Sequence, residues 1–184
     1  MNLFKQFNPP KLFLLFYSTV FLSACAGINV ESDQFSDDEA CNRLQGLIKD
    51  HKKQFTTYRK SRRPNKFYTI WSAEKVFTKA ENCQVWEWST GLYNYACSWK
   101  AKEGGAQAKS NYDEDVRIIK NCLDNSWKPR ITSTKSGGQH TLFSNDRSPT
   151  IVSIRYFAES KGFLENWYNT VVIGDKSNLN TPAQ

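Results

Sequence analysis

The five cysteines of this 184-residue chain limit its possible folds more than any other feature. Because disulfides use cysteines in pairs, an odd number in an exported protein leaves one thiol for another role. The first of them, Cys25, ends a segment laid out like a signal peptide, in which Lys5 and Lys11 precede an apolar run over 12–22. That run is too short to cross a bilayer as a helix. We therefore treat Cys25 separately from the four cysteines that follow it.

The tetrad Leu22-Ser23-Ala24-Cys25 resembles the lipobox of bacterial lipoprotein precursors, and the resemblance covers residues 1–25 only. It implies that 1–24 is a signal peptide and that Cys25 becomes an acylated N-terminus, with palmitate among its chains. More than one acyl chain is needed for stable anchoring. Ala26 follows in place of Asp, which in the enterobacterial sorting pattern implies the outer membrane, with the protein facing the periplasm. The alternative is an uncleaved helix that contains an incidental cysteine.

The mature chain is expected to be mildly basic and to stay near the membrane. Removal of 1–24 takes away two lysines and lowers the formal net charge from +7 to +5. Such a charge favours anionic surfaces and acidic partners without specifying one, and we expect no nucleic-acid partner in the envelope. The polar segment 26–35 predicts a tether that reaches under about 20 Å. A single domain is expected over 36–175, followed by a flexible tail over 176–184.

Two stretches have the periodicity of amphipathic helices. Ser36-Asp37-Asp38-Glu39 has the spacing of a capping box, and apolar residues then recur at intervals of three and four as far as Tyr58. A second pattern of the same period runs from Ala108 to Leu123. Basic residues crowd 49–63. They are explained more simply by a solvated helix face and loop than by a patch for anionic lipid phosphates.

Runs of β-branched and aromatic residues predict strands between and after these helices. The runs lie at 66–73, 83–89, 92–100, 140–143, 150–157 and 165–173. The stretch 131–149 is dense in Ser, Thr, Gly and Asn and predicts a mobile loop around its one short strand. The order helix, three strands, helix, three strands predicts an α+β fold with an antiparallel sheet packed by two amphipathic helices.

One predicted hairpin gathers many of the aromatic residues. Thr90-Gly91 predicts a two-residue turn that pairs Ser89 with Leu92. In that register one face of the sheet carries Trp86, Trp88, Tyr93, Tyr95 and Trp99. The first four are candidate ligand-binding residues, because exposed aromatic clusters rarely persist without a ligand. The alternative, which the sequence favours, is that these rings form the core beneath a helix.

The other four cysteines, Cys41, Cys83, Cys97 and Cys122, predict two disulfides in the oxidising compartment that the lipobox implies. The two-residue turn places Cys83 and Cys97 on opposite faces and disfavours a bond between them, whereas a three-residue turn reverses this. Of the two remaining pairings we prefer Cys41 with Cys83 and Cys97 with Cys122, because sequential partners emerge together during export. Since no cysteines or histidines have ligand spacing, we expect no metal site and no cofactor.

The sequence offers little for catalysis, and we expect a protein that is not an enzyme, with no catalytic residues. Of its two histidines, His51 lies on the apolar stripe of the first helix and is expected to be packed, which leaves His140 as the only plausible general base. The consecutive carboxylates of 113–115 point in different directions from a helix. No nucleophile elbow, zinc-protease motif or phosphate-binding loop is present.

Three hypotheses for function follow from these observations. The first is a non-catalytic, lipid-anchored binding module, attached to the membrane through Cys25, for an envelope protein or glycan. The second is an immunity protein or inhibitor of an enzyme that acts on the envelope, since a charge of +5 suits an acidic target. The third is a hydrolase that uses His140.

Overall fold

The computed structural model describes residues 37–64, 67–77, 79–161 and 164–176, which belong to one compact unit of the chain. The predicted signal peptide, Cys25 and the tether lie outside the described residues, as does nearly all of the predicted tail. The elements are α1 (Asp37–His51), a short 3-10 helix η1 (Thr56–Tyr58), β1 (Arg59–Pro64), β2 (Tyr68–Ala73), β3 (Asn82–Trp88), β4 (Tyr93–Ala101), α2 (Gly105–Cys122), β5 (Lys128–Ser133), β6 (Gln139–Ser144), β7 (Thr150–Lys161) and β8 (Leu164–Asp175).

All eight strands form one antiparallel sheet with the order β1-β2-β3-β4-β8-β7-β6-β5. The predicted α+β fold, an antiparallel sheet with two helices, is confirmed. Each helix is followed by a meander of four strands, where the sequence predicted three. The two meanders meet through their last strands, so β4 and β8 lie at the centre of the sheet.

The two strands that the sequence did not predict, β1 and β5, are the edges of the sheet. All six residues of β5 are exposed, and so are five of the six in β1. Neither strand therefore has the alternation of apolar and polar residues that identifies a half-buried strand. The prediction of a mobile loop over 131–149 was wrong, because β5 and β6 pair as a hairpin from Lys128 to Ser144. An edge position also explains why Pro129 is tolerated within β5.

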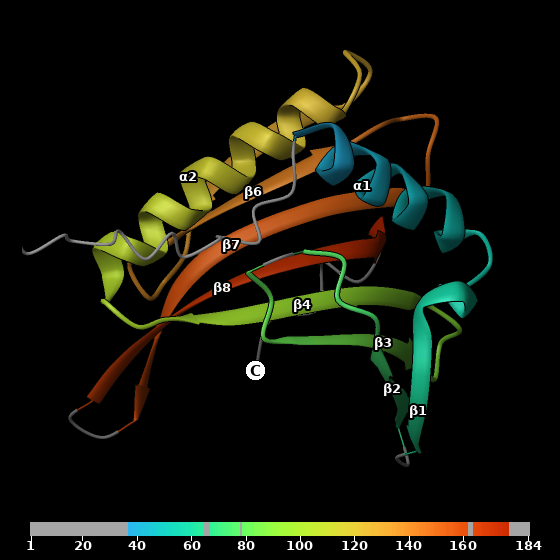
Figure 1. The fold of residues 1–184 in the computed structure, drawn as a ribbon, viewed down its shortest axis with the longest axis horizontal. Helices are drawn as coiled ribbons and strands as arrows, with labels where there is room; N and C mark the ends of the chain where they lie inside the picture. Colours follow the sequence, from blue (N-terminus) through green and yellow to red (C-terminus); the bar gives the residue numbers. More distant parts are fainter. Residues whose placement is uncertain (1–36, 65–66, 78, 162–163, 177–184) are drawn as a thin grey trace, which may run out of the picture. The chain divides into compact units, whose positions relative to one another are not determined.

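Both helices cover the same face of the sheet, as Figure 1 shows. Helix α2 packs on β7, β8 and β4, and α1 packs on β8, β4 and α2. We call this face of the sheet the inner face and the opposite one the outer face. The core lies between the inner face and the helices, and its fully buried members include Leu44, Leu47, Val85, Tyr95, Val152, Ile154, Val171 and Ile173.

Helix α1 ends at His51, earlier than the apolar stripe predicted. The chain then turns through two residues with left-handed backbone, Gln54 at φ 61° and Phe55 at φ 58°. The buried Asp50 carboxylate fixes this turn by accepting hydrogen bonds from the Thr57 amide at 3.1 Å and hydroxyl at 2.8 Å. Phe55 is nevertheless fully buried. The stripe therefore identified core residues correctly but assigned them to one straight helix.

The β3–β4 hairpin has a three-residue turn, so the predicted two-residue register was wrong. Trp88 and Leu92 face each other across it, and the Trp88 amide donates to the Leu92 carbonyl at 2.9 Å. Gly91 has φ +80°, a conformation that glycine adopts without strain. In this register Cys83 lies opposite Cys97. A shift of one residue moves every side chain of one strand to the other face of the sheet.

All four predicted cysteines form disulfides, as the sequence predicted, but the preferred pairing was wrong. The bonds join Cys41 to Cys122 and Cys83 to Cys97. The second bond follows directly from the three-residue turn, which places both cysteines on the inner face. The first joins α1 to α2, because the two helices lie side by side on that face. Order of emergence during export was thus a poorer guide than strand register.

Candidate functional site

The four predicted ligand-binding residues lie on opposite faces of the sheet and do not form one platform. Tyr93 and Tyr95 point into the core, where Tyr95 is fully buried. Their hydroxyls donate at 2.6 Å, from Tyr93 to Glu87 Oε1 and from Tyr95 to the Glu74 carbonyl. The core interpretation therefore holds for these two rings, as it does for the buried Trp99. Trp86 and Trp88 alternate with the inward-facing Val85 and so lie on the outer face.

A different set of rings forms an aromatic cluster on the outer face. Tyr68 of β2 pairs with Trp88, and its neighbour Ile70 pairs with Trp86. The ring centroids of Tyr68 and Trp86 are 5.3 Å apart, and those of Trp86 and Trp88 are 5.6 Å apart. All four side chains are partly accessible. We call Tyr68, Ile70, Trp86 and Trp88 the aromatic cluster.

Cations outnumber acids on the outer face. Side chains of residues paired across an antiparallel sheet share a face, so the register places each charged residue. Among the described strand residues of this face, the basic ones are Arg63, Lys100, Lys128, Arg130 and Arg155, and the acidic one is Glu159. By contrast, acids outnumber cations on the two helices. The acids are Asp37, Asp38, Glu39, Asp50 and the three of 113–115, and the cations are Arg43, Lys49, Lys109, Arg117 and Lys120. Cations are thus in excess on the face that the helices leave uncovered, whereas acids are in excess on the helices.

Arg155 of β7 lies between the basic residues of β4 and those of β5 on this face. Its Nε donates to Thr170 Oγ1 at 3.0 Å, and its guanidinium lies 4.8 Å from the centroid of the Phe157 ring. Burial lowers the pKa of Arg155 from its usual value. Within the described part of the chain, Arg155 makes no ion pair with a carboxylate. A planar guanidinium in this setting is suited to bidentate binding of a carboxylate or phosphate.

His140 of β6 lies opposite Arg155 of β7 in the strand register. Its Nε2 atom lies within hydrogen-bonding distance of Ser153 Oγ, at 2.8 Å. Burial, and then the charges of Arg155 and Arg130, lower the pKa of His140. His140 is therefore neutral at pH 7, and the two arginines supply the charge. A serine next to a histidine is the contact that a hydrolase needs. Ser153 is only 4% exposed, however, and no acid among the described residues orients His140. The pair has the form of a structural contact between β6 and β7.

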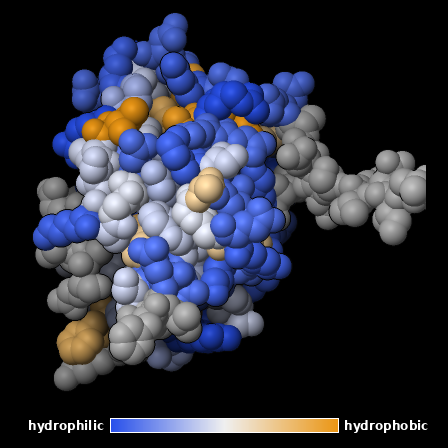
Figure 2. Space-filling model, turned by 90° about the vertical axis from the view of Figure 1, so that its left-hand side faces the viewer, coloured by the Kyte–Doolittle hydropathy of each residue, from blue (hydrophilic) through white to orange (hydrophobic). Residues whose placement is uncertain are grey.

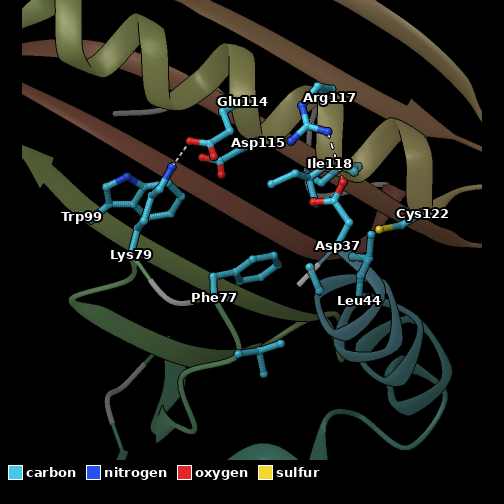
Figure 3. Close-up of a pocket in the computed structure, with 13 residues that line it drawn as sticks. Asp37, Leu44, Phe77, Lys79, Trp99, Glu114, Asp115, Arg117, Ile118 and Cys122 are labelled. Carbon is cyan, nitrogen blue, oxygen red and sulfur yellow. Dashed lines mark hydrogen bonds and ion pairs between the residues drawn. The ribbon is translucent and has the colours of Figure 1, made fainter. Parts of the chain in front are cut away.

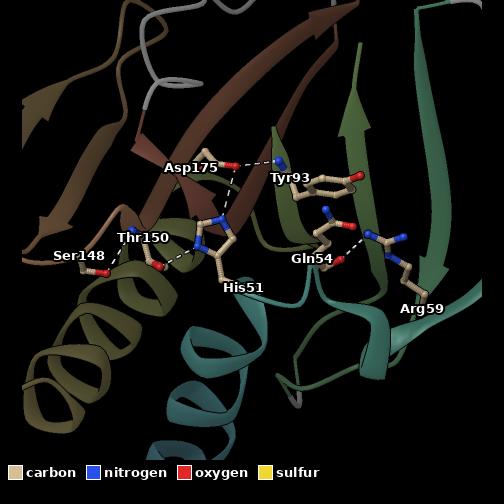
Figure 4. Close-up of polar contacts among 7 residues, drawn as sticks. All are labelled: His51, Gln54, Arg59, Tyr93, Ser148, Thr150 and Asp175. Carbon is tan, nitrogen blue, oxygen red and sulfur yellow. Dashed lines mark hydrogen bonds and ion pairs between the residues drawn. The ribbon is translucent and has the colours of Figure 1, made fainter. Parts of the chain in front are cut away.

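His51, the other histidine, is buried as the sequence predicted. Figure 4 shows its contacts: Nδ1 lies 2.7 Å from Thr150 Oγ1, and Nε2 lies 3.4 Å from Asp175 Oδ2. The same Asp175 oxygen accepts the Tyr93 amide at 2.8 Å. Hydroxyl, imidazole and carboxylate have the composition of a catalytic triad, but Thr150 is 2% exposed and no substrate reaches it. This network joins the end of α1 to β4, β7 and β8.

The surface in Figure 2 is mostly hydrophilic, with hydrophobic residues in small separate patches. That side of the molecule offers no broad apolar docking area. No helix among the described residues is both long and apolar enough to span a membrane. The same residues contain no group of three or more His, Cys, Asp or Glu side chains placed to hold a metal ion.

Comparison with family models, with curated proteins and with solved structures finds no match to this chain. Sequence reasoning identified Trp86, Trp88 and His140 but not Tyr68 or Arg155. The period-two alternation along β2 and β7 carried that signal, but only the correct register places these side chains on the same face of the sheet.

Proposed function

We propose that this chain is a non-catalytic, lipid-anchored module that binds an acidic protein of the bacterial envelope through its outer sheet face. The observation that carries the proposal is the excess of cations on this face, five Arg or Lys against Glu159. Complementary charge guides a partner to such a surface and suppresses binding of basic competitors.

A protein partner accounts for the aromatic cluster together with the arginines. Trp, Tyr and Arg are the residues that most often dominate binding energy in protein interfaces. The aromatic cluster on β2 and β3 and Arg155 on β7 supply all three types on one face, with β4 and β8 between them. A rigid antiparallel sheet holds them without the entropic cost of ordering a loop on binding. The lipobox resemblance supports the anchor, and the short tether keeps the face within reach of membrane-associated partners.

Charge reversal on the outer face tests the proposal. We expect Arg63→Glu with Arg130→Glu, both exposed, to weaken partner binding by about tenfold. The control is Lys53→Glu with Lys75→Glu, which changes the net charge equally at exposed positions outside the face. The full chain in detergent is cross-linked in envelope extract, the partner is identified, and its affinity for each variant is measured.

An acidic partner lost by the first variant and kept by the control supports the proposal. If purified sacculi retain the wild type and the Arg63 and Arg130 variant equally well, the chain binds glycan, and the proposal is contradicted. If the captured partner is an enzyme, inhibition of that enzyme by the wild type and not by the reversed variant identifies the chain as its inhibitor or immunity protein.

A further inference from the structure

A pocket of about 190 Å³ opens between the two helices and the loop that joins β2 to β3. Figure 3 shows Asp115, Arg117 and Ile118 pointing into it from α2, Asp37 and Leu44 from α1, and Phe77 from the loop. Its walls are mainly apolar, and its charged residues come from α2, from the start of α1 and, with Lys79, from the loop. An engineered apolar cavity of about 150 Å³ admits benzene, so this pocket has room for one six-membered ring and a small substituent.

Four of the five charged residues around the pocket are paired with each other. Lys79 bonds to Glu114, and Arg117 Nη1 lies 3.2 Å from Asp37 Oδ2. Each pair joins a cation to an acid that lines the same pocket, so the two pairs cancel. Asp115 is the fifth charged residue. When Asp115 is ionised, the pocket therefore carries one uncompensated negative charge.

One oxygen of the Asp115 carboxyl group, Oδ2, is buried, although the residue as a whole is only partly buried. Within the described part of the chain, nothing hydrogen-bonds to Oδ2, and Trp99 Nε1 on the pocket wall is also unpaired. Burial raises the pKa of Asp115 to about 7, while Lys79 lowers it and Glu114 raises it further. An unpaired buried polar group is costly. The site consequently lacks one cation that donates hydrogen bonds.

The raised pKa of Asp115 predicts a dependence of stability on pH. The folded chain holds this proton to about pH 7, whereas the unfolded carboxyl group loses it near its ordinary value of 3.8. Since the folded state binds more protons in that range, the free energy of unfolding falls as the pH rises from about 4 to 7. Asp115→Asn is expected to remove this fall, while Asp113→Asn at an exposed position of α2 leaves it. Urea unfolding of both variants between pH 4 and 8 measures the effect, and equal slopes in the two variants contradict it.

We propose that this pocket binds a small organic ammonium ion that carries one ring, with Asp115 as its counter-ion. The ammonium group supplies the missing cation and pairs with the Asp115 carboxylate in the pocket wall. The ring fits between Phe77 and Ile118, where an aromatic wall also favours a nearby cation. This site lies on the helix side of the sheet and is independent of the outer face.

Benzylammonium is the probe, and benzyl alcohol is its uncharged counterpart. With the full chain in detergent we expect benzylammonium to bind saturably with a Kd of about 1 mM. Benzyl alcohol is expected to bind at least about tenfold more weakly, because it lacks the charge-assisted hydrogen bond. Asp115→Asn should weaken benzylammonium binding by the same factor, and Asp113→Asn should leave it unchanged. Shifts of the Trp99 indole proton resonance in NMR spectra report the binding.

Proton release provides a test on the wild type alone, which holds even if the Asp115 variant fails to fold. At pH 6 the ammonium ion displaces a proton from Asp115. Because a tenfold preference for the ionised carboxylate moves its titration by about one pH unit, calorimetry in buffers of different ionisation enthalpy should record at least about 0.4 proton released per ligand. At pH 8 the release should be nearly zero. The proposal is overturned by equal affinity for the alcohol, by unchanged proton release between the two pH values, or by no saturation at about 10 mM.

Discussion

Replacement of Cys41 and Cys122 together by alanine is expected to lower the free energy of unfolding by about 4.5 kcal/mol. The bond spans 81 residues, and the loop-closure entropy that it removes from the unfolded chain has that value for a loop of this length. It also ties α1 to α2, the two helices that together cover the inner face. A typical domain has a total stability of about 5–15 kcal/mol, so the loss is a large fraction of it.

The matched comparison is replacement of Cys83 and Cys97, whose bond spans 14 residues. Its entropic effect is about 3 kcal/mol, and the β3–β4 hydrogen bonds hold the same hairpin without it. Because removal of the longer cross-link lets the unfolded chain expand more, the urea m-value should rise more in the Cys41 and Cys122 variant. Equal m-values for the two double variants would show that the long-range bond does not act on the unfolded state.

The pairing of the cysteines shows what this sequence can and cannot reveal. Composition and the oxidising compartment that the lipobox resemblance implies were enough to predict that Cys41, Cys83, Cys97 and Cys122 all form disulfides. Their partners depended on one residue in the β3–β4 turn, because a two-residue and a three-residue turn place Cys83 on opposite faces. Gly91 is compatible with both turns. Local sequence therefore predicted the hairpin but not its register.

The same limit applies to the candidate sites. Strand alternation gave Trp86 and Trp88 a common face. Arg155 shares that face only because β4 pairs with β8, and these two strands are far apart in the sequence. Asp115 was one of three consecutive carboxylates that were expected to point in different directions. Asp113 does point away and bonds to Lys109 in solvent, but Glu114, which bonds to Lys79, and Asp115 line the same pocket. Of the three, Asp115 has a buried oxygen with no hydrogen-bonding partner among the described residues. Only packing between α2 and the β2–β3 loop distinguishes the third from the others.

Replacement of Phe55 by alanine is expected to lower the free energy of unfolding by about 3–5 kcal/mol, the usual loss for a buried phenylalanine. The ring is fully buried and lies 5.3 Å from His51 and 6.1 Å from Tyr95, between centroids. It therefore packs the end of α1 against β4. Phe55 also has φ 58°, a conformation that is unfavourable for every residue with a Cβ atom.

Glycine at position 55 should therefore cost less than alanine, by about 1 kcal/mol, although glycine is the poorer substitute at most sites. Both variants lose the ring, so their difference isolates the backbone. Gln54 tests the same backbone without a buried side chain, since it is exposed and has φ 61°. Gln54→Gly should stabilise the chain by up to about 1 kcal/mol, whereas Lys53→Gly, one residue earlier, should destabilise it by about 0.5–1 kcal/mol. Urea unfolding of the four variants measures these effects. If Phe55→Gly proves less stable than Phe55→Ala, the burial of Phe55 does not hold a strained turn, and the early end of α1 needs another cause.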